Sequence, residues 1–309
     1  IIGGGPSGIT VAYYLVIRGY DVTIYDGLPK LGGATFFGIP KYRFPISSLD
    51  KQVDLLVAAG VTIKVNTRVN AEMFDRLREE NTAVFIGTGL MKPRALRAPG
   101  EDLPGVLDAL SFLTNQHIGK PSPIRKGDIV VVVGGGNTAV DAARVSRRMG
   151  ADVIIAYRRR KEDMPADWEE LEDAEAENVA LICQNIPLRV EEKDGQLDFI
   201  WGPSEMVADK PGRRPRPKLI EGVNNHLVCD KVIVAVGQGP DLSWLSPEMA
   251  GQVADKGGWI AVDNDGMTKI EDVYAGGDLV NETADAISAI ADGLKVVQGI
   301  LRKTAKAPK

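Results

Sequence analysis

The fold of this chain is decided by residues 129–139, which read IVVVVGGGNTA, and by a second stretch at residues 2–8, which reads IGGGPSG. In both, apolar residues end in a glycine-rich turn, and a pattern with helical spacing follows. A second apolar strand then follows each helix. The distance between turn and second strand agrees at 23 positions in the two copies: Gly3 to Asp26 and Gly134 to Tyr157. The sequence therefore predicts two βαβ units, each beginning a parallel sheet.

The two glycine turns have the spacing that binds a dinucleotide. The first glycine permits a tight turn, the second lets the backbone approach a pyrophosphate, and the third allows helix and strand to pack closely. The helix that follows presents unpaired N–H groups and a partial positive charge to the phosphates. Glycine turns also serve purely structural ends, but two copies in register favour two dinucleotide sites.

The residues after the second strand distinguish the two sites. Asp26 ends the first copy, and its carboxylate can accept hydrogen bonds from a ribose; the alternative is an ordinary surface aspartate. Tyr157 takes that position in the second copy, followed by Arg158, Arg159 and Arg160. Guanidinium groups suit a 2′-phosphate, so this site is predicted to prefer NADP(H) over NAD(H). The alternative is a solvated charged turn.

A further pair of strands indicates how the two domains are connected. Residues 83–89 and 232–239 each read as a short buried strand that ends in Gly-x-Gly. We therefore predict two Rossmann-like α/β domains, one inserted in the other, with residues 1–115 and 241–309 forming the discontinuous domain and residues 116–240 the inserted one. The first strand has only two residues before its turn, so we expect the natural protein to extend upstream.

The composition excludes several classes of function. The 309 residues carry a net charge of −5, which gives no support for a nucleic-acid partner, and no apolar run is long enough for a membrane span. Two cysteines and two histidines, all isolated, exclude a zinc or iron–sulfur site within the chain, a redox disulfide and a cysteine–histidine nucleophile. The cysteine content fits a reducing cytoplasm.

Several motifs resemble the small-subunit family of glutamate synthase over essentially the whole chain. These are GG at 32–33, FGIPKYRFP at 37–45, PGE at 99–101, YRR at 157–159, MPA at 164–166, GRRP at 212–215, AVGQ at 235–238 and GGD at 276–278. The resemblance implies FAD in the discontinuous domain, NADPH (or NADH) in the inserted one, and electrons that leave through iron–sulfur clusters. It extends to the large subunit of NADH-dependent ferredoxin:NADP oxidoreductase and to half of dihydropyrimidine dehydrogenase.

The family's cofactor contacts are carried over by position. For FAD they are Gly3, Gly5, Pro6, Ser7, Gly8, Asp26, Gly33, Thr88, Gly89, Gly277, Asp278, Ala286 and Ile287. For NADPH they are Gly134, Gly136, Asn137, Thr138, Ala139, Arg158, Arg159 and Gly237. No side chain is expected to act as a catalyst, because hydride transfer relies on the cofactors and the protein supplies orientation and electrostatics. The predicted function is an electron-transfer subunit that passes hydride between NADPH and FAD. Its predicted partner is an iron–sulfur domain or subunit, a ferredoxin or a larger oxidoreductase complex. Electron flow is reversed, toward NAD(P)+, in some relatives, and the sequence does not fix its direction.

The chain also departs from the family's pattern. Asp26 stands where glutamate is usual, Leu294 stands where the family has arginine, and the cysteine-rich cluster domain is absent. This function has three alternatives. A thioredoxin-reductase-like enzyme needs a CxxC that the chain lacks, whereas a flavin-dependent monooxygenase and an FAD-binding relay subunit without nicotinamide chemistry stay open.

Overall fold

The computed structural model describes residues 1–208, 215–255, 257–281 and 283–304, so three residues of the GRRP motif, 212–214, lie outside the described residues. The chain forms two compact units: residues 1–37, 41–92 and 239–309 make the first, and residues 38–40 and 93–238 the second. The chain therefore passes between the two units mainly at Lys92–Pro93 and Gln238–Gly239. The sequence predicts these crossings near residues 115 and 240 instead. Residues 93–115 join the second unit because they contain a strand of its sheet.

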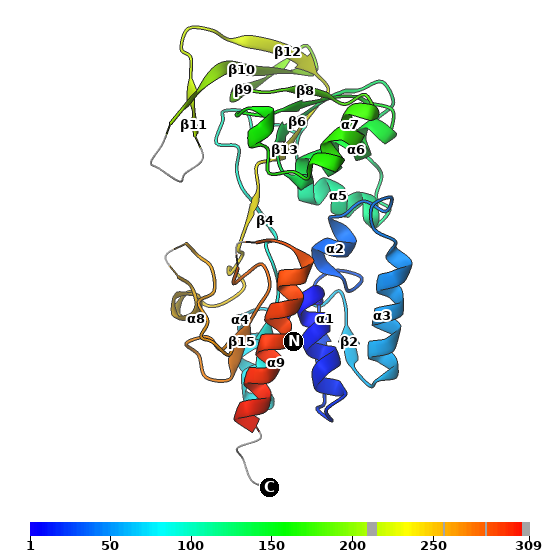
Figure 1. The fold of residues 1–309 in the computed structure, drawn as a ribbon, viewed down its shortest axis with the longest axis vertical. Helices are drawn as coiled ribbons and strands as arrows, with labels where there is room; N and C mark the ends of the chain where they lie inside the picture. The colour runs from blue at the N-terminus through cyan, green and yellow to red at the C-terminus, as the bar shows by residue number, and fades with distance from the viewer. Residues whose placement is uncertain (209–214, 256, 282, 305–309) are drawn as a thin grey trace. The chain divides into compact units, whose positions relative to one another are not determined.

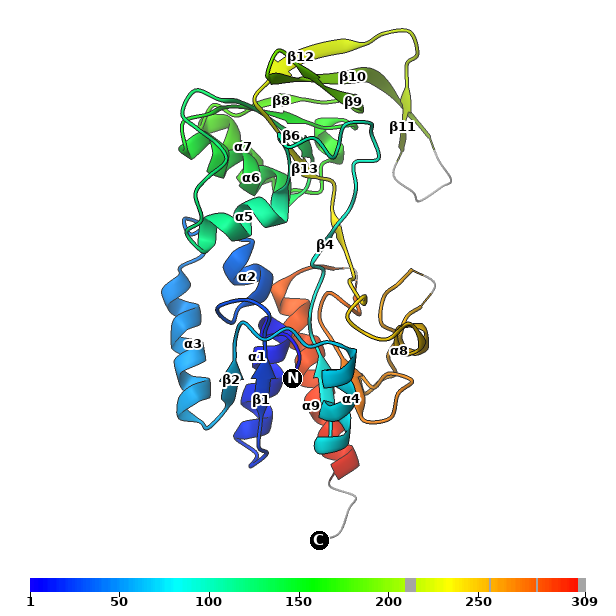
Figure 2. The same ribbon diagram turned by 180° about the vertical axis from the view of Figure 1, so that it is seen from behind.

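The first unit contains a parallel sheet of very short strands (Figure 2). They are β1 (Thr23–Tyr25), β2 (Thr62–Lys64), β3 (Val84–Ile86) and β15 (Val273–Ala275), paired β1 with β2 and β3 with β15. Ile2 joins the two pairs, because it forms parallel bridges to both Tyr25 and Ile86. The residue before the first glycine turn thus occupies the centre of the sheet.

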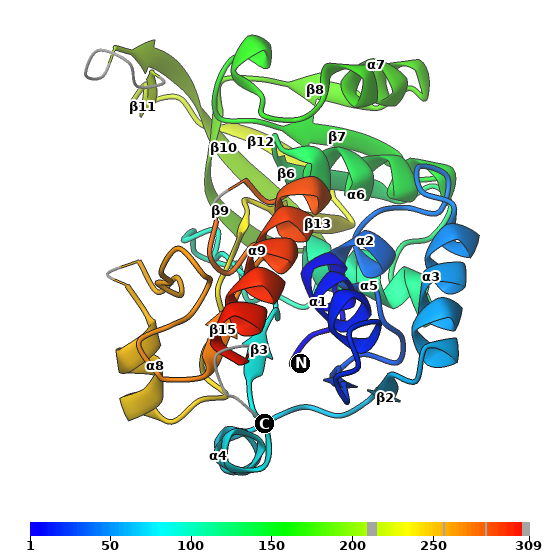
Figure 3. The ribbon, with the colours of Figure 1, turned by 60° about the horizontal axis from the view of Figure 1, so that its bottom comes forward.

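Helices cover both faces of this sheet. They are α1 (Pro6–Val16), α2 (Gly33–Phe37), α3 (Ile46–Ala58), α4 (Ala71–Glu80), α8 (Pro247–Val253) and α9 (Ala286–Thr304). Helices α1 and α9 lie side by side (Figures 1 and 3) and bury Phe85 and Tyr274 on one face. Helices α4 and α8 pack near Val84 and Ile86 on the other. Successive side chains of a strand therefore pack into two different cores, one on each face of the sheet, as expected for a parallel sheet buried on both sides.

The second unit is built on a longer parallel sheet with the order β5-β13-β6-β7-β8. Its strands are β5 (Val106–Asp108), β6 (Ile129–Gly134), β7 (Asp152–Ala156), β8 (Ala180–Ile182) and β13 (Lys231–Ala235). Helices α5 (Ala109–His117), α6 (Asn137–Arg148) and α7 (Trp168–Ala176) contribute to the core on one face, and a 3-10 turn, η1, spans Lys161–Asp163. Two short strands at the crossings, β4 (Lys92–Pro93) and β14 (Gln238–Gly239), pair with each other.

An antiparallel sheet covers the other face of the second unit's parallel sheet. Its strands are β9 (Asn185–Lys193), β10 (Gln196–Val207), β11 (Arg216–Leu219) and β12 (Asn225–Cys229). In β6, Val130 and Val132 pack in the helical core, whereas Val131 and Val133 pack against Phe199 of β10 and its neighbours. The unbroken valine run is explained by this arrangement, because a strand buried on both faces has no polar side.

No helix in the part of the chain that the structure describes is long and apolar enough to cross a membrane.

We predict that Gly299→Ala destabilises the protein although alanine normally favours a helix. A Cβ at Gly299, in α9, would overlap the backbone carbonyl of Asp265, and overpacking of this kind costs about 1–3 kcal/mol. Gly251→Ala in α8 is the matched control, because a Cβ there meets nothing within 4 Å and is expected to be neutral or stabilising by about 0.5–1 kcal/mol. Urea denaturation measures both, and a Gly299→Ala variant as stable as Gly251→Ala would contradict the packing.

Candidate dinucleotide-binding sites

The first glycine of each turn is required by the fold itself. Gly3 has φ +98° and Gly134 has φ +154°, both in the region that L side chains rarely adopt. A Cβ at Gly3 would overlap the carbonyl oxygen of Gly87, and one at Gly134 would overlap that of Ala235. Each turn therefore lies directly against the neighbouring strand's end, and no other residue fits there.

The third position of each turn is also decided by packing. A Cβ at Gly8 would overlap the carbonyl oxygen of Gly3, so α1 begins in direct contact with the turn before it. Its counterpart Ala139 is completely buried, and a Cβ on Gly134 would come within 3.1 Å of its methyl group. The small size of Gly8 and Ala139 lets helix and strand pack closely, and neither position has space for a larger side chain.

The middle glycines are different, because no neighbour requires them. A Cβ at Gly5 would be 3.9 Å from the Cα of Gly33, and one at Gly136 would be 3.9 Å from Cγ of Pro165. Both residues are helix N-caps without a side-chain hydrogen bond, and both have ordinary negative φ values. The structure leaves open space beside each, next to unpaired N–H groups of a helix start. That is the space a phosphate needs at close approach to the backbone.

Asp26 lies immediately after β1 and supports the first turn. Its Oδ2 accepts a hydrogen bond from the Gly4 N–H at 2.7 Å, and its Oδ1 accepts one from the Leu28 N–H at 2.8 Å. Burial raises the pKa of this carboxyl, while the two N–H donors and the nearby Arg68 oppose the rise. The carboxylate that is predicted to contact a ribose thus also holds Gly4 at the end of β1 through a hydrogen bond.

In the second unit Tyr157 occupies the position that Asp26 has in the first, and it supports the glycine turn by packing against it. Its ring is so close to Gly135 that a Cβ there would overlap it, and its hydroxyl donates to the carbonyl of Asp163 at 2.9 Å. Arg158 and Arg159 follow at the end of β7, and Arg159 Nε is buried without a hydrogen-bond partner among the described residues. An unpaired buried donor of this kind fits an anionic ligand.

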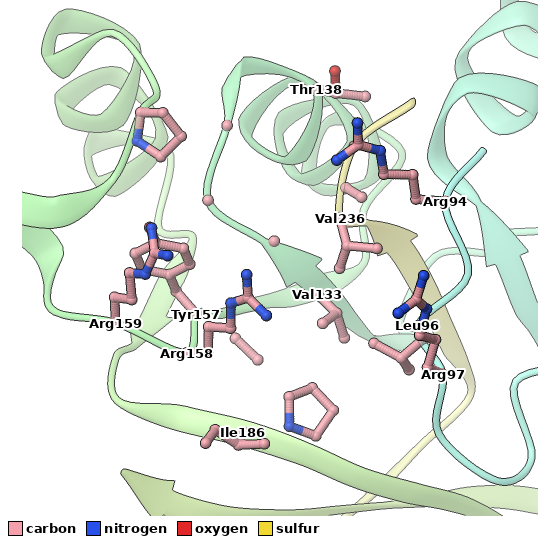
Figure 4. A pocket seen from close by; sticks show the side chains of 18 of the residues that line it. Arg94, Leu96, Arg97, Val133, Thr138, Tyr157, Arg158, Arg159, Ile186 and Val236 are labelled. Carbon is pink, nitrogen blue, oxygen red and sulfur yellow. The ribbon is translucent and has the colours of Figure 1, made fainter. Parts of the chain in front are cut away.

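These groups line a cavity of about 730 Å³ that lies entirely within the second unit (Figure 4). Of the residues carried over for NADPH, the following line it: Gly134, Gly136, Thr138, Arg158, Arg159 and Gly237. The volume is in the range of typical small-molecule sites. Ala139 is not among the lining residues, because it is buried under the turn.

Asn137 has a positioning role in this structure. Its Nδ2 donates to the Asp167 carboxylate at 3.2 Å, and its Oδ1 accepts from the Asp167 N–H at 2.9 Å. Because both ends of the amide are engaged, the side chain ties the start of α6 to the start of α7. Its backbone, at the helix N-terminus, stays available for a ligand.

The residues carried over for FAD gather at the carboxyl ends of β1, β3 and β15. Thr88 and Gly89 follow β3, and the Thr88 hydroxyl is buried with no hydrogen-bond partner among the described residues. Gly277, with φ +77°, follows β15, and a Cβ there would lie 2.9 Å from Oγ of the buried Ser7 of α1. Pro6 begins α1, and Gly33 has φ +53° where it approaches Gly5. The orphaned hydroxyl and the open space at Gly5 both fit a bound dinucleotide.

The start of α9 completes this group. Ala286 is the first helical residue, and the Asp285 carboxylate accepts a hydrogen bond from the Ser288 N–H at 2.8 Å. Ile287 is 81% exposed, which is unusual for an isoleucine and leaves it open to a ligand. Asp278 lies nearby, and burial, with repulsion from Asp285 and Asp292, raises its pKa to about 6.

Several cavity residues were not predicted from the sequence. They are Arg94, Ala95, Leu96, Arg97, Val133, Gly135, Ala156, Tyr157, Pro165, Ile186, Pro187, Ala235 and Val236. Some could have been found, because Val133, Gly135, Ala156 and Ala235 adjoin the predicted strand ends. Arg94 and Arg97 carry no comparable signal, since they lie about 40 residues before the turn and belong to no recognised spacing.

Comparison with known proteins places these observations in a family. The family model described as pyridine nucleotide-disulphide oxidoreductase matches residues 1–293. The chain is 38% identical over 307 residues to the beta subunit of an NADP(+)-dependent formate dehydrogenase from Moorella thermoacetica, covering 97% of this chain and 43% of the relative. It is 34% identical over 319 residues to the small chain of glutamate synthase [NADPH] from Escherichia coli (strain K12), covering 97% and 67%.

Solved structures share the fold. FprA from Mycobacterium tuberculosis in complex with NADPH matches with a TM-score of 0.79 and 20% identity, covering 100% of this chain and 86% of FprA. The chain spans less than half of the formate dehydrogenase subunit that it matches. By its sequence matches, the chain belongs to the pyridine nucleotide-disulphide oxidoreductase family, among the relatives of the glutamate synthase small chain, and it has two Rossmann-like domains.

Proposed function

We propose that this chain transfers electrons between NADPH and an iron–sulfur carrier, with FAD held by the first unit and NADPH by the second. The chemistry that the cofactors supply when bound is hydride exchange between NADPH and FAD and one-electron exchange with the carrier. The protein's own residues bind and orient these groups, and no side chain is assigned a catalytic step.

One observation supports the proposal above all others. Both turns have outer positions that packing dictates and a middle glycine, Gly5 or Gly136, that packing does not require. A glycine retained where a side chain would fit, beside an uncapped helix start, is explained by a ligand that must touch the backbone. The same device in two separate units supports two dinucleotides.

The FAD assignment rests on the first unit's polar groups. Gly5 leaves room for the pyrophosphate, the buried Thr88 hydroxyl is unpaired among the described residues, and Asp26 lies where a ribose is expected. We assign the remaining carried-over residues Gly3, Pro6, Ser7, Gly8, Gly33, Gly89, Gly277, Asp278, Ala286 and Ile287 to the same site. The N-terminus of α9 contributes partial positive charge there.

The NADPH assignment rests on the cavity of the second unit. Tyr157 stands where an NAD-binding domain would have a carboxylate, Arg158 and Arg159 follow it, and no Asp or Glu among the described residues lines the cavity. Guanidinium groups bind a phosphate through charge-assisted, bidentate hydrogen bonds. The site is therefore suited to the 2′-phosphate that distinguishes NADPH from NADH.

The partner and the compartment are inferred from other features. The matched relatives include proteins named as subunits, and the family resemblance implies an iron–sulfur carrier outside this chain. Cys183 and Cys229 are both free thiols, and burial raises the pKa of each, to about 12 for Cys229. Unreactive reduced cysteines fit the cytoplasm.

We predict that anaerobic NADPH bleaches the visible flavin absorbance of the FAD-loaded protein completely. Gly136→Ala should require a concentration of NADPH about tenfold higher or more, because the methyl group occupies the space beside the helix start. Gly251→Ala serves as the control and should behave as the unmodified protein. Absence of bleaching by either NADPH or NADH would favour a relay subunit, and rapid substrate-dependent oxygen consumption would favour a monooxygenase.

We also predict that Arg158→Ala combined with Arg159→Ala selectively weakens NADPH binding. The loss should be about tenfold or more for NADPH and small for NADH, since only NADPH carries the 2′-phosphate. Equilibrium binding of the two oxidised dinucleotides measures the ratio. An unchanged preference would mean that the two arginines are solvated and make no phosphate contact.

The raised pKa of Asp278 leads to a pH dependence of FAD binding. Below its pKa of about 6 the carboxyl is neutral, and above it a negative charge develops beside an anionic cofactor. FAD affinity is therefore expected to fall several-fold as the pH rises from about 5 to about 8. Asp278→Asn should flatten the curve, whereas Asp21→Asn, at an exposed site, should leave it unchanged. A curve that Asp278→Asn does not alter would remove this residue from the site.

A further inference from the structure

The cavity of the second unit has an unusual charge for this protein. Four arginines line it, namely Arg94, Arg97, Arg158 and Arg159, and its lining contains no carboxylate. The chain as a whole carries a net charge of −5. Because like charges repel in one cavity, four guanidinium groups without an acidic partner among the described residues favour the binding of an anion there.

The four arginines come from two different segments. Arg158 and Arg159 extend from the end of β7, whereas Arg94 and Arg97 extend from the chain that follows β4. Figure 4 shows Arg94 on the side of the cavity where Thr138 of α6 lies, and Arg159 on the other side. The cavity thus has two positive regions, and a phosphate has been assigned to Arg158 and Arg159 but not yet to Arg94 and Arg97.

The backbone that carries Arg94 and Arg97 is held firmly. The Arg94 N–H donates to the Gly237 carbonyl at 3.0 Å, and a Cβ on Gly237 would lie 3.6 Å from Cδ of Arg94. Arg97 adopts φ +59°, a conformation rare for a residue with a side chain, and its N–H donates to the Glu101 carboxylate at 2.7 Å. A strained and anchored backbone is typical of a functional segment.

The side chains themselves are free. Both arginines are exposed, and neither guanidinium forms a hydrogen bond or ion pair with any residue that the structure describes. Both guanidinium groups therefore line the cavity on a fixed backbone, without a partner among the described residues. This separates them from Arg160, which pairs with Asp163 at 2.9 Å and does not line the cavity.

We infer that Arg94, supported by Arg97, binds the pyrophosphate of NADPH beside the start of α6. This inference rests on the proposed function of the cavity. The helix start supplies only about half a positive charge, whereas a pyrophosphate carries two negative charges and the 2′-phosphate carries up to two more. Arg158 and Arg159 match the 2′-phosphate, which leaves the other pair to match the pyrophosphate.

The test uses two ligands that share the 2′-phosphate and differ in the pyrophosphate: 2′-AMP and 2′-phospho-ADP-ribose. Titration calorimetry with the FAD-loaded chain measures both. Arg94→Gln keeps the aliphatic part of the side chain against Gly237. It is expected to weaken the binding of 2′-phospho-ADP-ribose about tenfold or more and to leave the affinity for 2′-AMP within about twofold of the unmodified protein. The Arg158→Ala, Arg159→Ala protein should weaken both ligands, and Arg125→Ala, on the exposed surface of the same unit, should weaken neither.

The outcomes separate this inference from the function on which it rests. If the unmodified protein binds neither ligand, the NADPH site itself is wrong and the inference falls with it. If it binds both and Arg94→Gln changes neither, or changes both equally, the NADPH site stands and the pyrophosphate role of Arg94 is overturned. A partial recovery of 2′-phospho-ADP-ribose binding in Arg94→Lys would support a charge contact with the pyrophosphate.

Discussion

The structure depends on the direct contact between a helix start and the glycine turn before it. In the first unit, α1 begins so close to the turn that a methyl group at Gly8 would overlap the carbonyl of Gly3. In the second, the fully buried Ala139 takes the same place beside Gly134. This closeness brings unpaired helical N–H groups to the end of the sheet, and the middle glycine then leaves the space in front of them open. Packing and binding are therefore served by different glycines of one turn.

The sequence was sufficient for this device because it is local. The strand, the turn and the helix are consecutive, so their spacing predicts two units, and both are present with the expected strand ends at Asp26 and Tyr157. Features formed by distant segments were not predictable in the same way. The three-residue strand β5 is too short to show a pattern, so residues 93–115 could not be assigned to the second unit before its pairing with β13 was known.

The type of a residue also predicts its role less well than the contacts that it makes in the structure. Asp26 was expected as a ribose ligand, and the sequence contains no sign that its two oxygens would hold the backbone of Gly4 and Leu28. The resemblance predicts that Asn137 contacts NADPH, but its amide joins α6 to Asp167. In both cases a short polar side chain reaches nearby backbone groups first. Both side chains therefore fix the shape of the backbone next to them.

The two sites deal with phosphate charge in opposite ways, and the difference follows from their surroundings. The first unit places Asp278 near Asp285 and Asp292, so burial and repulsion favour a neutral carboxyl, and positive potential comes from helix starts. In the second, four arginines are the charged residues that line the cavity among those the structure describes. A dinucleotide with only a pyrophosphate suits the first arrangement, and one with an additional 2′-phosphate suits the second. Arg94 and Gly237 lie next to the paired crossing strands β4 and β14, so the second site uses the chain segments that enter and leave its own unit. An insertion of one domain in another brings such segments together, which explains why these arginines are invisible to a local motif.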